Sequence, residues 1–233
     1  MTIFTIGHST RSLDDFIALL QAHGINCLAD IRTVPKSRRH PHFAGDALAQ
    51  SLPAQNIVYR HFPGLGGLRK PRRDSTNTGW RHEGFRGYAD YMQTVEFARA
   101  LDELIHWADD GECDSGSGRG GMRRRRSVLD TPERYSARAC TPDSLEPLRG
   151  AYAPGNSGGG GVPAAIDKAG APRVVIMCAE AVWWRCHRQL VADALVARGI
   201  EVRHIASVSS APSHTLTAFA RVDAERVSYP GLL

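Results

Sequence analysis

Several reactive side chains stand at the ends of apolar, strand-like runs of the sequence. They are His8 and Ser9 after residues 3–6, Asp30 and Arg32 at the end of residues 25–31, and Cys178 and Glu180 after residues 174–177. Histidine moves protons near neutral pH, a carboxylate acts as a base or a nucleophile, and a cysteine thiolate is a nucleophile. This mixture of residue types predicts an acid–base or nucleophilic site.

The apolar runs alternate with segments of helical pattern. Strands are expected at residues 3–6, 25–31, 57–59, 174–178 and 201–205, and helices at residues 12–24, 46–55, 88–107 and from the fourth strand to Arg198, with a loop as the tail. Strands that alternate with helices predict a mostly parallel sheet of about five strands with helices on both faces, Rossmann-like or flavodoxin-like. Ligands of such sheets bind beyond the carboxyl ends of the strands, where the reactive residues stand.

The pocket predicted at this edge has a division of roles. Arg32 is expected to hold a carboxylate or phosphate, and His8 to move a proton, oriented by Asp30 or Glu180. Cys178 is expected at the floor, where the helix predicted to follow it would favour the thiolate. Ordinary packing explains a cysteine at a strand end equally well, and ordinary capping explains a glutamate in a first helical turn.

The segment Trp183-Trp184-Arg185-Cys186-His187-Arg188 is the densest local signal. On a helix, Trp183 and His187 would share the buried face, so His187 is interpreted as a packed core histidine. Trp184 and Arg188 would share the adjacent face and stack on a base or grip a phosphate. No metal site is predicted, because neither a Cys-x-x-Cys pair nor a histidine pair accompanies Cys178 and Cys186.

The net charge is +5, but residues 32–86 hold eleven Lys/Arg and three acids, a net +8. Such a window attracts phosphates on nucleic acid or on a small ligand, and a solvated Arg-rich surface is the alternative interpretation. Residues 7–12 resemble an anion cradle in which Ser9 takes part, and Arg38 follows the second strand as a possible phosphate clamp.

Residues 111–171 change in character, with twelve of the 23 glycines and no apolar period. They are expected to be a low-complexity, disordered insertion in a single domain that spans residues 1–233. No secretory signal and no apolar run of membrane-spanning length is present, and the five cysteines lack paired spacing. A cytoplasmic location without a membrane partner is therefore expected.

A family resemblance rests on three groups of residues: Ile6-Gly7-His8-Ser9, then Asp30-Ile31-Arg32 with Pro35 and Ser37, then Cys178-Ala179-Glu180 with Cys186-His187-Arg188. Together they resemble the bacterial domain-of-unknown-function family numbered 488, over roughly residues 1–110 and 173–205. The resemblance implies an α/β domain with a shared pocket and transfers no reaction and no cofactor. Residues 111–171 depart from the family pattern.

Three functions remain open from the sequence. The first is an enzyme that acts on a nucleotide, nucleoside or nucleic acid through the pocket at the strand ends. The second is a non-catalytic module that binds nucleic acid or a phosphometabolite, for which the basic window suffices. The third is a cysteine-based sulfur or redox enzyme built on Cys178.

Overall fold

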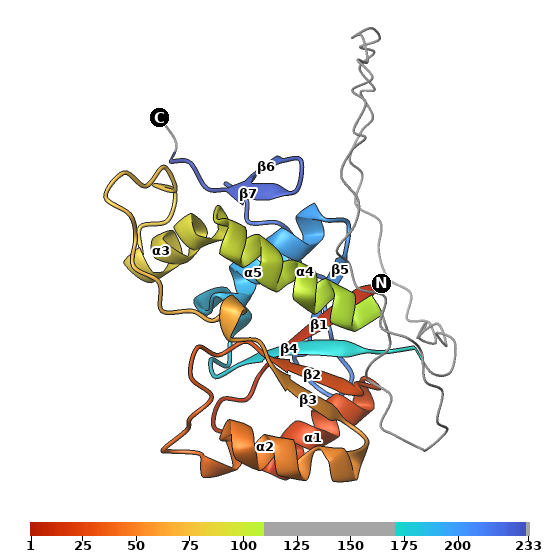
Figure 1. Cartoon of the computed structure of the whole chain (residues 1–233). Helices are drawn as coiled ribbons and strands as arrows, with labels where there is room; N and C mark the ends of the chain where they lie inside the picture. The colour runs from red at the N-terminus through yellow and green to blue at the C-terminus, as the bar shows by residue number, and fades with distance from the viewer. Residues whose placement is uncertain (110–170, 232–233) are drawn as a thin grey trace, which may run out of the picture. The chain divides into compact units, whose positions relative to one another are not determined.

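A computed structural model describes residues 1–109 and 171–231 of the chain (Figure 1). The strands are β1 (Thr2–Gly7), β2 (Cys27–Asp30), β3 (Val58–His61), β4 (Val174–Cys178), β5 (Glu201–His204), β6 (Arg221–Asp223) and β7 (Arg226–Ser228). The α-helices are α1 (Leu13–Ala22), α2 (Gly45–Ser51), α3 (Glu83–Met92), α4 (Val95–Asp109) and α5 (Arg188–Ala197). Short 3-10 turns occupy η1 (Pro41–Phe43), η2 (Pro53–Gln55), η3 (Pro63–Leu65) and η4 (Trp183–Arg185).

The main sheet has five strands in the order β3-β2-β4-β1-β5, and all its pairs are parallel. The predicted α/β class is therefore confirmed. Because the strands run the same way, their carboxyl ends share one edge. The register places Gly7 beside Cys178 and Asp30 beside Met177, so the central strands end almost level.

Helices cover both faces of the sheet (Figure 1). Along β2, Leu28 belongs to the apolar cluster that α1 and α2 complete, whereas Ala29 belongs to the cluster that α3, α4 and α5 complete. Side chains alternate between the faces of a strand, so a strand covered on both faces must be apolar throughout. Residues 174–178 are buried without exception, as this requires.

The helix predicted at residues 88–107 is in fact two helices, α3 and α4. α3 begins earlier than predicted, at Glu83, and the chain leaves the helix at Gln93 and Thr94. The Thr94 hydroxyl accepts a hydrogen bond from the Phe97 N–H and donates one to the Tyr91 carbonyl. Thr94 therefore ends α3 and caps α4, which explains the break between the two helices. The spacing of apolar residues alone does not reveal such a break.

Two further predictions of local structure are wrong. The helix before Arg198 was expected directly after the fourth strand, but α5 begins only at Arg188, after a 3-10 turn and an extended Cys186. The tail is not simply a loop, because β6 and β7 pair as an antiparallel hairpin. The 3-10 turn and the two hairpin strands are short, and hydrogen bonds rather than a long apolar pattern define them.

The predicted insertion at residues 111–171 lies, except for its last residue, outside the described part of the chain. Within the described part, no helix is both long enough and apolar enough to cross a membrane.

Candidate functional site

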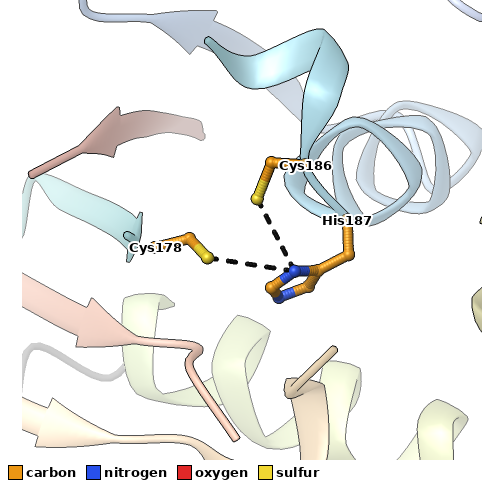
Figure 2. A group of neighbouring side chains, drawn as sticks. All are labelled: Cys178, Cys186 and His187. Carbon is orange, nitrogen blue, oxygen red and sulfur yellow. Dashed lines mark hydrogen bonds between the residues drawn. The ribbon is translucent and has the colours of Figure 1, made fainter. Parts of the chain in front are cut away.

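Two thiols and an imidazole meet at the carboxyl edge of the sheet (Figure 2). Cys178, Cys186 and His187, called the thiol triad below, bring two Sγ atoms and one ring nitrogen within 4.8 Å of one another. The His187 Nδ1 atom lies 3.9 Å from the Cys178 Sγ and 3.6 Å from the Cys186 Sγ. Both cysteines are free and buried.

The turn after β4 assembles the triad. Cys178 is the last residue of β4, and the chain then turns through η4. Cys186 follows in an extended conformation, with φ −133° and ψ 150°, and His187 is the N-cap of α5. The chain thereby returns over the strand end that it has just left, and Cys186 and His187 come back to Cys178.

A hydrogen bond to the next strand orients His187. Its Nε2–H donates to the carbonyl of Ile31, just beyond β2, over 3.1 Å. A ring nitrogen that donates to a carbonyl leaves the other nitrogen with its lone pair, so Nδ1 faces both sulfurs as an acceptor. Gly67 lies close on the same ring, because a Cβ there would stand 2.9 Å from Nδ1.

The two thiols have opposite pKa shifts. The hydrogen bond from Cys178 lowers the pKa of Cys186 well below its usual value, and the nearby charge of Arg188 adds to this against the effect of burial. The pKa of Cys178 is raised because it donates to Cys186 and is buried. One sulfur of the pair is therefore favoured as a thiolate, the form that acts as nucleophile and as metal ligand.

Arg188 is buried beside the triad, with 1% of its surface exposed. Its Nη2 donates to the backbone carbonyl of Glu180 at 2.5 Å and to that of Ala181 at 3.3 Å. The same loop presses on Gly7, where a Cβ would stand only 1.8 Å from the Glu180 oxygen. Arg188 and Gly7 thus hold the turn that connects Cys178 to the rest of the triad.

A second polar cluster lies beside the triad at the ends of β1 and β2. Arg32 binds Asp30 through Nε at 2.8 Å and Nη2 at 2.5 Å, and its Nη1 donates to the His8 Nε2 at 3.3 Å. The His8 Nδ1–H donates to the Ser9 carbonyl, so the ring is neutral. Burial lowers the pKa of His8 to about 4, and the Arg32 charge contributes. The Tyr59 hydroxyl also donates to Asp30.

The structure thus brings His8, Asp30 and Arg32 together, and it joins them to the triad through the backbone. The backbone N–H of His8 donates to the backbone carbonyl of Cys178. Ile31, whose carbonyl accepts the hydrogen bond from His187, lies between Asp30 and Arg32 in the chain. The Arg32 guanidinium is already bound by Asp30 and His8, with 6% of the side chain exposed. Its predicted role toward a ligand stays a prediction.

The remaining predicted residues lie outside both clusters. Glu180 is exposed, and its carboxylate accepts from the Ala181 N–H, while Ser9 is half-buried at φ 51°. Arg38 is exposed in the loop after β2, and 54% of Trp184 is exposed. The prediction that Trp184 and Arg188 share a helix face is wrong, because Trp184 lies in η4 and Arg188 opens α5.

Sequence reasoning passed over Cys186 and His187 as functional residues. It placed them on a continuous helix with His187 packed in the core, and it set aside Cys178 and Cys186 as metal ligands because no Cys-x-x-Cys pair or histidine pair accompanies them. One signal in the sequence could have identified them. The strand ends in Cys178, and the pair Cys186-His187 stands at the start of the helix that follows. A turn between the two elements must return the pair to the strand end.

The distances within the triad suit a metal ion. Zinc takes sulfur at about 2.3 Å and nitrogen at about 2.0–2.1 Å in a tetrahedron, which sets sulfur and nitrogen about 3.6 Å apart. The observed separations of 3.6 and 3.9 Å are close to this value. A histidine whose second nitrogen donates to a backbone carbonyl is also typical of metal ligands.

A cavity of about 620 Å³ lies elsewhere, between α4, α5 and the β6–β7 hairpin. Its lining includes Phe97, Arg198 and Val227 but no member of the triad. Arg198 forms ion pairs there with Asp102 and Glu225. We therefore base the candidate site on the triad, where the reactive groups converge.

The fold and this edge define the class: an α/β protein whose main sheet is all-parallel, with a thiol–imidazole cluster at the carboxyl ends of its strands. The sequence pattern of the family described as domain of unknown function DUF488 matches residues 12–113 and 161–195, more than half of the chain. The chain belongs to this DUF488 family, as its motifs predicted. No curated protein and no solved structure gives a match.

Proposed function

We propose that the chain is a metal-dependent enzyme whose catalytic ion is bound by Cys178, Cys186 and His187, and that it acts on a nucleotide or nucleic acid. The observation that carries the proposal is the convergence of three ligand atoms within 4.8 Å. Thiolate and imidazole together favour zinc among the common ions.

The number of ligands favours catalysis over a structural role. Structural zinc sites hold four protein ligands, whereas catalytic sites hold three and leave the fourth position to water or substrate. Within residues 1–109 and 171–231, the group of candidate ligands has three members. An ion bound there would supply a nucleophilic hydroxide or polarise a substrate oxygen.

The substrate class is supported by the two loops that touch His187. The loop after β2 begins at Ile31, and the loop after β3 contains Gly67. These loops carry exposed basic side chains that make no ion pair with another described residue: Lys36, Arg38, Arg39, Lys70, Arg73 and Arg81. Unpaired basic side chains around a site attract phosphates.

Metal analysis tests the ion directly. Protein dialysed after exposure to zinc should keep about one ion per chain, and Cys186→Ser and His187→Ala should lose it, because each removes a ligand. His82→Ala, which removes an exposed histidine outside the triad, is the matched control and should keep the ion. Retention of zinc by both triad variants would overturn the proposed centre.

Turnover tests the reaction. Zinc-loaded protein should convert at least one member of a panel of nucleotides, nucleosides and short oligonucleotides. Cys186→Ser should lower that rate at least about 100-fold, while His82→Ala stays within about twofold. A panel without any zinc-dependent turnover would count against the enzyme and leave binding as the remaining function.

The second candidate is a metal-free cysteine enzyme of sulfur or redox chemistry. It is favoured by the presence of two free thiols on one imidazole nitrogen. Alkylation separates the two candidates. Iodoacetamide should label Cys186 slowly in zinc-loaded protein and at least about tenfold faster after removal of zinc, because a bound thiolate is protected. Rapid labelling of Cys186 at the same rate with and without zinc would favour the metal-free enzyme.

A further inference from the structure

Arg188 is a buried cation without a carboxylate partner. Among the described residues it is the largest of the fully buried side chains, and no aspartate or glutamate there forms an ion pair with it. Arg32, the neighbouring buried arginine, differs because Asp30 binds it on two nitrogens. Burial of a charge is unfavourable unless an opposite charge lies close, so Arg188 requires an anion.

The hydrogen bonds of Arg188 are also incomplete. Its Nη2 donates to the carbonyls of Glu180 and Ala181, but its Nε–H is buried and finds no acceptor in the described part of the chain. Carbonyl oxygens carry only partial charge and cannot neutralise a guanidinium. The loop contacts therefore fix the position of Arg188 without a carboxylate to balance its charge.

The thiol triad lies within the field of this charge. Arg188 directly follows His187 in the chain, and its Nη2 donates to the carbonyls of the two residues that lie two and three positions after Cys178. Two thiolates and a divalent ion sum to zero, so the ion-loaded triad cannot neutralise Arg188. One further negative charge beside the ion would balance the site.

We infer that the fourth ligand of the ion is an anionic oxygen group of the substrate, a phosphate or a carboxylate, and that Arg188 is the residue that selects it. This inference rests on the proposed function, because it needs the ion at the triad. Arg188 suits the role because a guanidinium is always protonated and its planar fork matches oxyanions. Its burial also excludes the water that would screen the attraction.

Cobalt provides a readout that does not depend on turnover. Cobalt bound by thiolates absorbs visible light, and the bands shift when the fourth ligand changes. Inorganic phosphate and acetate, titrated into cobalt-loaded protein, should shift the bands with saturation. The affinity for phosphate should fall at least about tenfold in Arg188→Met, because the compensating charge is lost.

Arg185→Met is the matched control, since Arg185 is an exposed arginine three positions away and outside the triad. Its phosphate affinity should stay within about twofold of the wild type. Arg188→Lys keeps the charge without the fork, so it should bind phosphate more tightly than Arg188→Met and more weakly than the wild type. If Arg188→Met does not load cobalt, the comparison of Arg188→Lys with Arg185→Met decides.

The outcomes separate this inference from the proposed function. Wild-type protein that shows no cobalt–thiolate bands would overturn the proposed function itself. Normal bands together with equal phosphate affinity in Arg188→Met, Arg188→Lys and the wild type would overturn only the role of Arg188. Preference for acetate over phosphate would retain the anion and assign the substrate to carboxylates.

Discussion

Gly7 has no room for a side chain, because the backbone of the loop after β4 lies directly against it. The Cβ of an alanine would stand 1.8 Å from the Glu180 oxygen and 2.9 Å from an Arg188 nitrogen. We expect Gly7→Ala to lower the free energy of unfolding by about 3 kcal/mol or more, as overpacking against backbone does. Urea denaturation measures this loss.

Gly84→Ala is the matched control, because the nearest atoms belong to the flexible His82 side chain at 3.1 Å and the position lies in the first turn of α3. Its stability should change by about 0.5 kcal/mol or less, with alanine the better helix former. Equal effects of the two substitutions would show that the loop does not close on Gly7.

His8 makes stability depend on pH. Its pKa is about 4 in the folded protein against 6.5 for an ordinary histidine, so the unfolded chain binds the proton first. Stability should therefore decline as pH falls from about 6.5 to about 4, by about 1–3 kcal/mol for this group, and the effect should level off below that range.

Denaturation at pH 7 and pH 4.5 measures the effect, with His8→Asn as the comparison. The variant lacks the titrating ring, so its loss of stability between the two values should be smaller. An identical loss in both proteins would show that His8 does not carry this part of the pH dependence.

At the residue scale, sequence alone predicted the partners that lie at strand ends. His8, Asp30 and Arg32 meet because parallel strands bring their carboxyl ends together, and that rule needs no knowledge of turns. Cys186 and His187 reach Cys178 only through η4 and one extended residue. No periodicity encodes such a turn, which is why the triad was not predicted.

At the scale of elements, Asp193 of α5 binds residues of the segment that follows β5. Its carboxylate is fully buried and accepts hydrogen bonds from the His214 ring, the Thr217 amide and hydroxyl, and the Tyr229 hydroxyl, at 2.7 to 2.9 Å. His214 in turn bonds to His204 at the end of β5. The network therefore links a helix, a strand and the tail.

We expect Asp193→Ala to lower the free energy of unfolding by about 3–5 kcal/mol, because it leaves buried donors without an acceptor. Tyr229→Phe should cost about 1–2 kcal/mol, since it removes one of these hydrogen bonds. Asp102→Ala is the control, because that acid is 66% exposed in its pair with Arg198. Chemical denaturation that ranks Asp102→Ala with Asp193→Ala would contradict the account.

Elements with a long apolar pattern were predictable, and those held by hydrogen bonds were not. β4 stands out in the sequence because five consecutive residues are apolar and buried. The break between α3 and α4 depends on Thr94, and the β6–β7 hairpin on three residues per strand. Polar contacts of this kind form only once the surrounding chain is in place.

At the scale of the whole molecule, the exposed basic loops predict binding that depends on salt. If these loops contact a polyanion, affinity for a short single-stranded DNA should fall at least about tenfold between 50 and 200 mM salt, because each neutralised phosphate releases counterions. Replacement of Lys36, Arg38 and Arg39 by serine should weaken binding and flatten this dependence. Fluorescence anisotropy measures both effects.

Arg221 and Arg226 on the hairpin are exposed and lie outside the two loops, so their replacement by serine is the control and should leave the dependence unchanged. An affinity for DNA that does not change with salt concentration would show that the two loops do not bind a polyanion. The proposed metal centre would stand, with a small ligand as its substrate.

The sheet and its covered faces followed from the alternation of strands and helices, and this arrangement sets the edge at which the triad lies. X-ray absorption at the zinc edge of the zinc-loaded full chain tests directly whether Cys178, Cys186 and His187 bind the ion. We expect two sulfur neighbours at about 2.3 Å and two nitrogen or oxygen neighbours at about 2.0–2.1 Å, with one sulfur lost in Cys186→Ser. A shell of nitrogen and oxygen alone, or an unchanged shell in that variant, would contradict it.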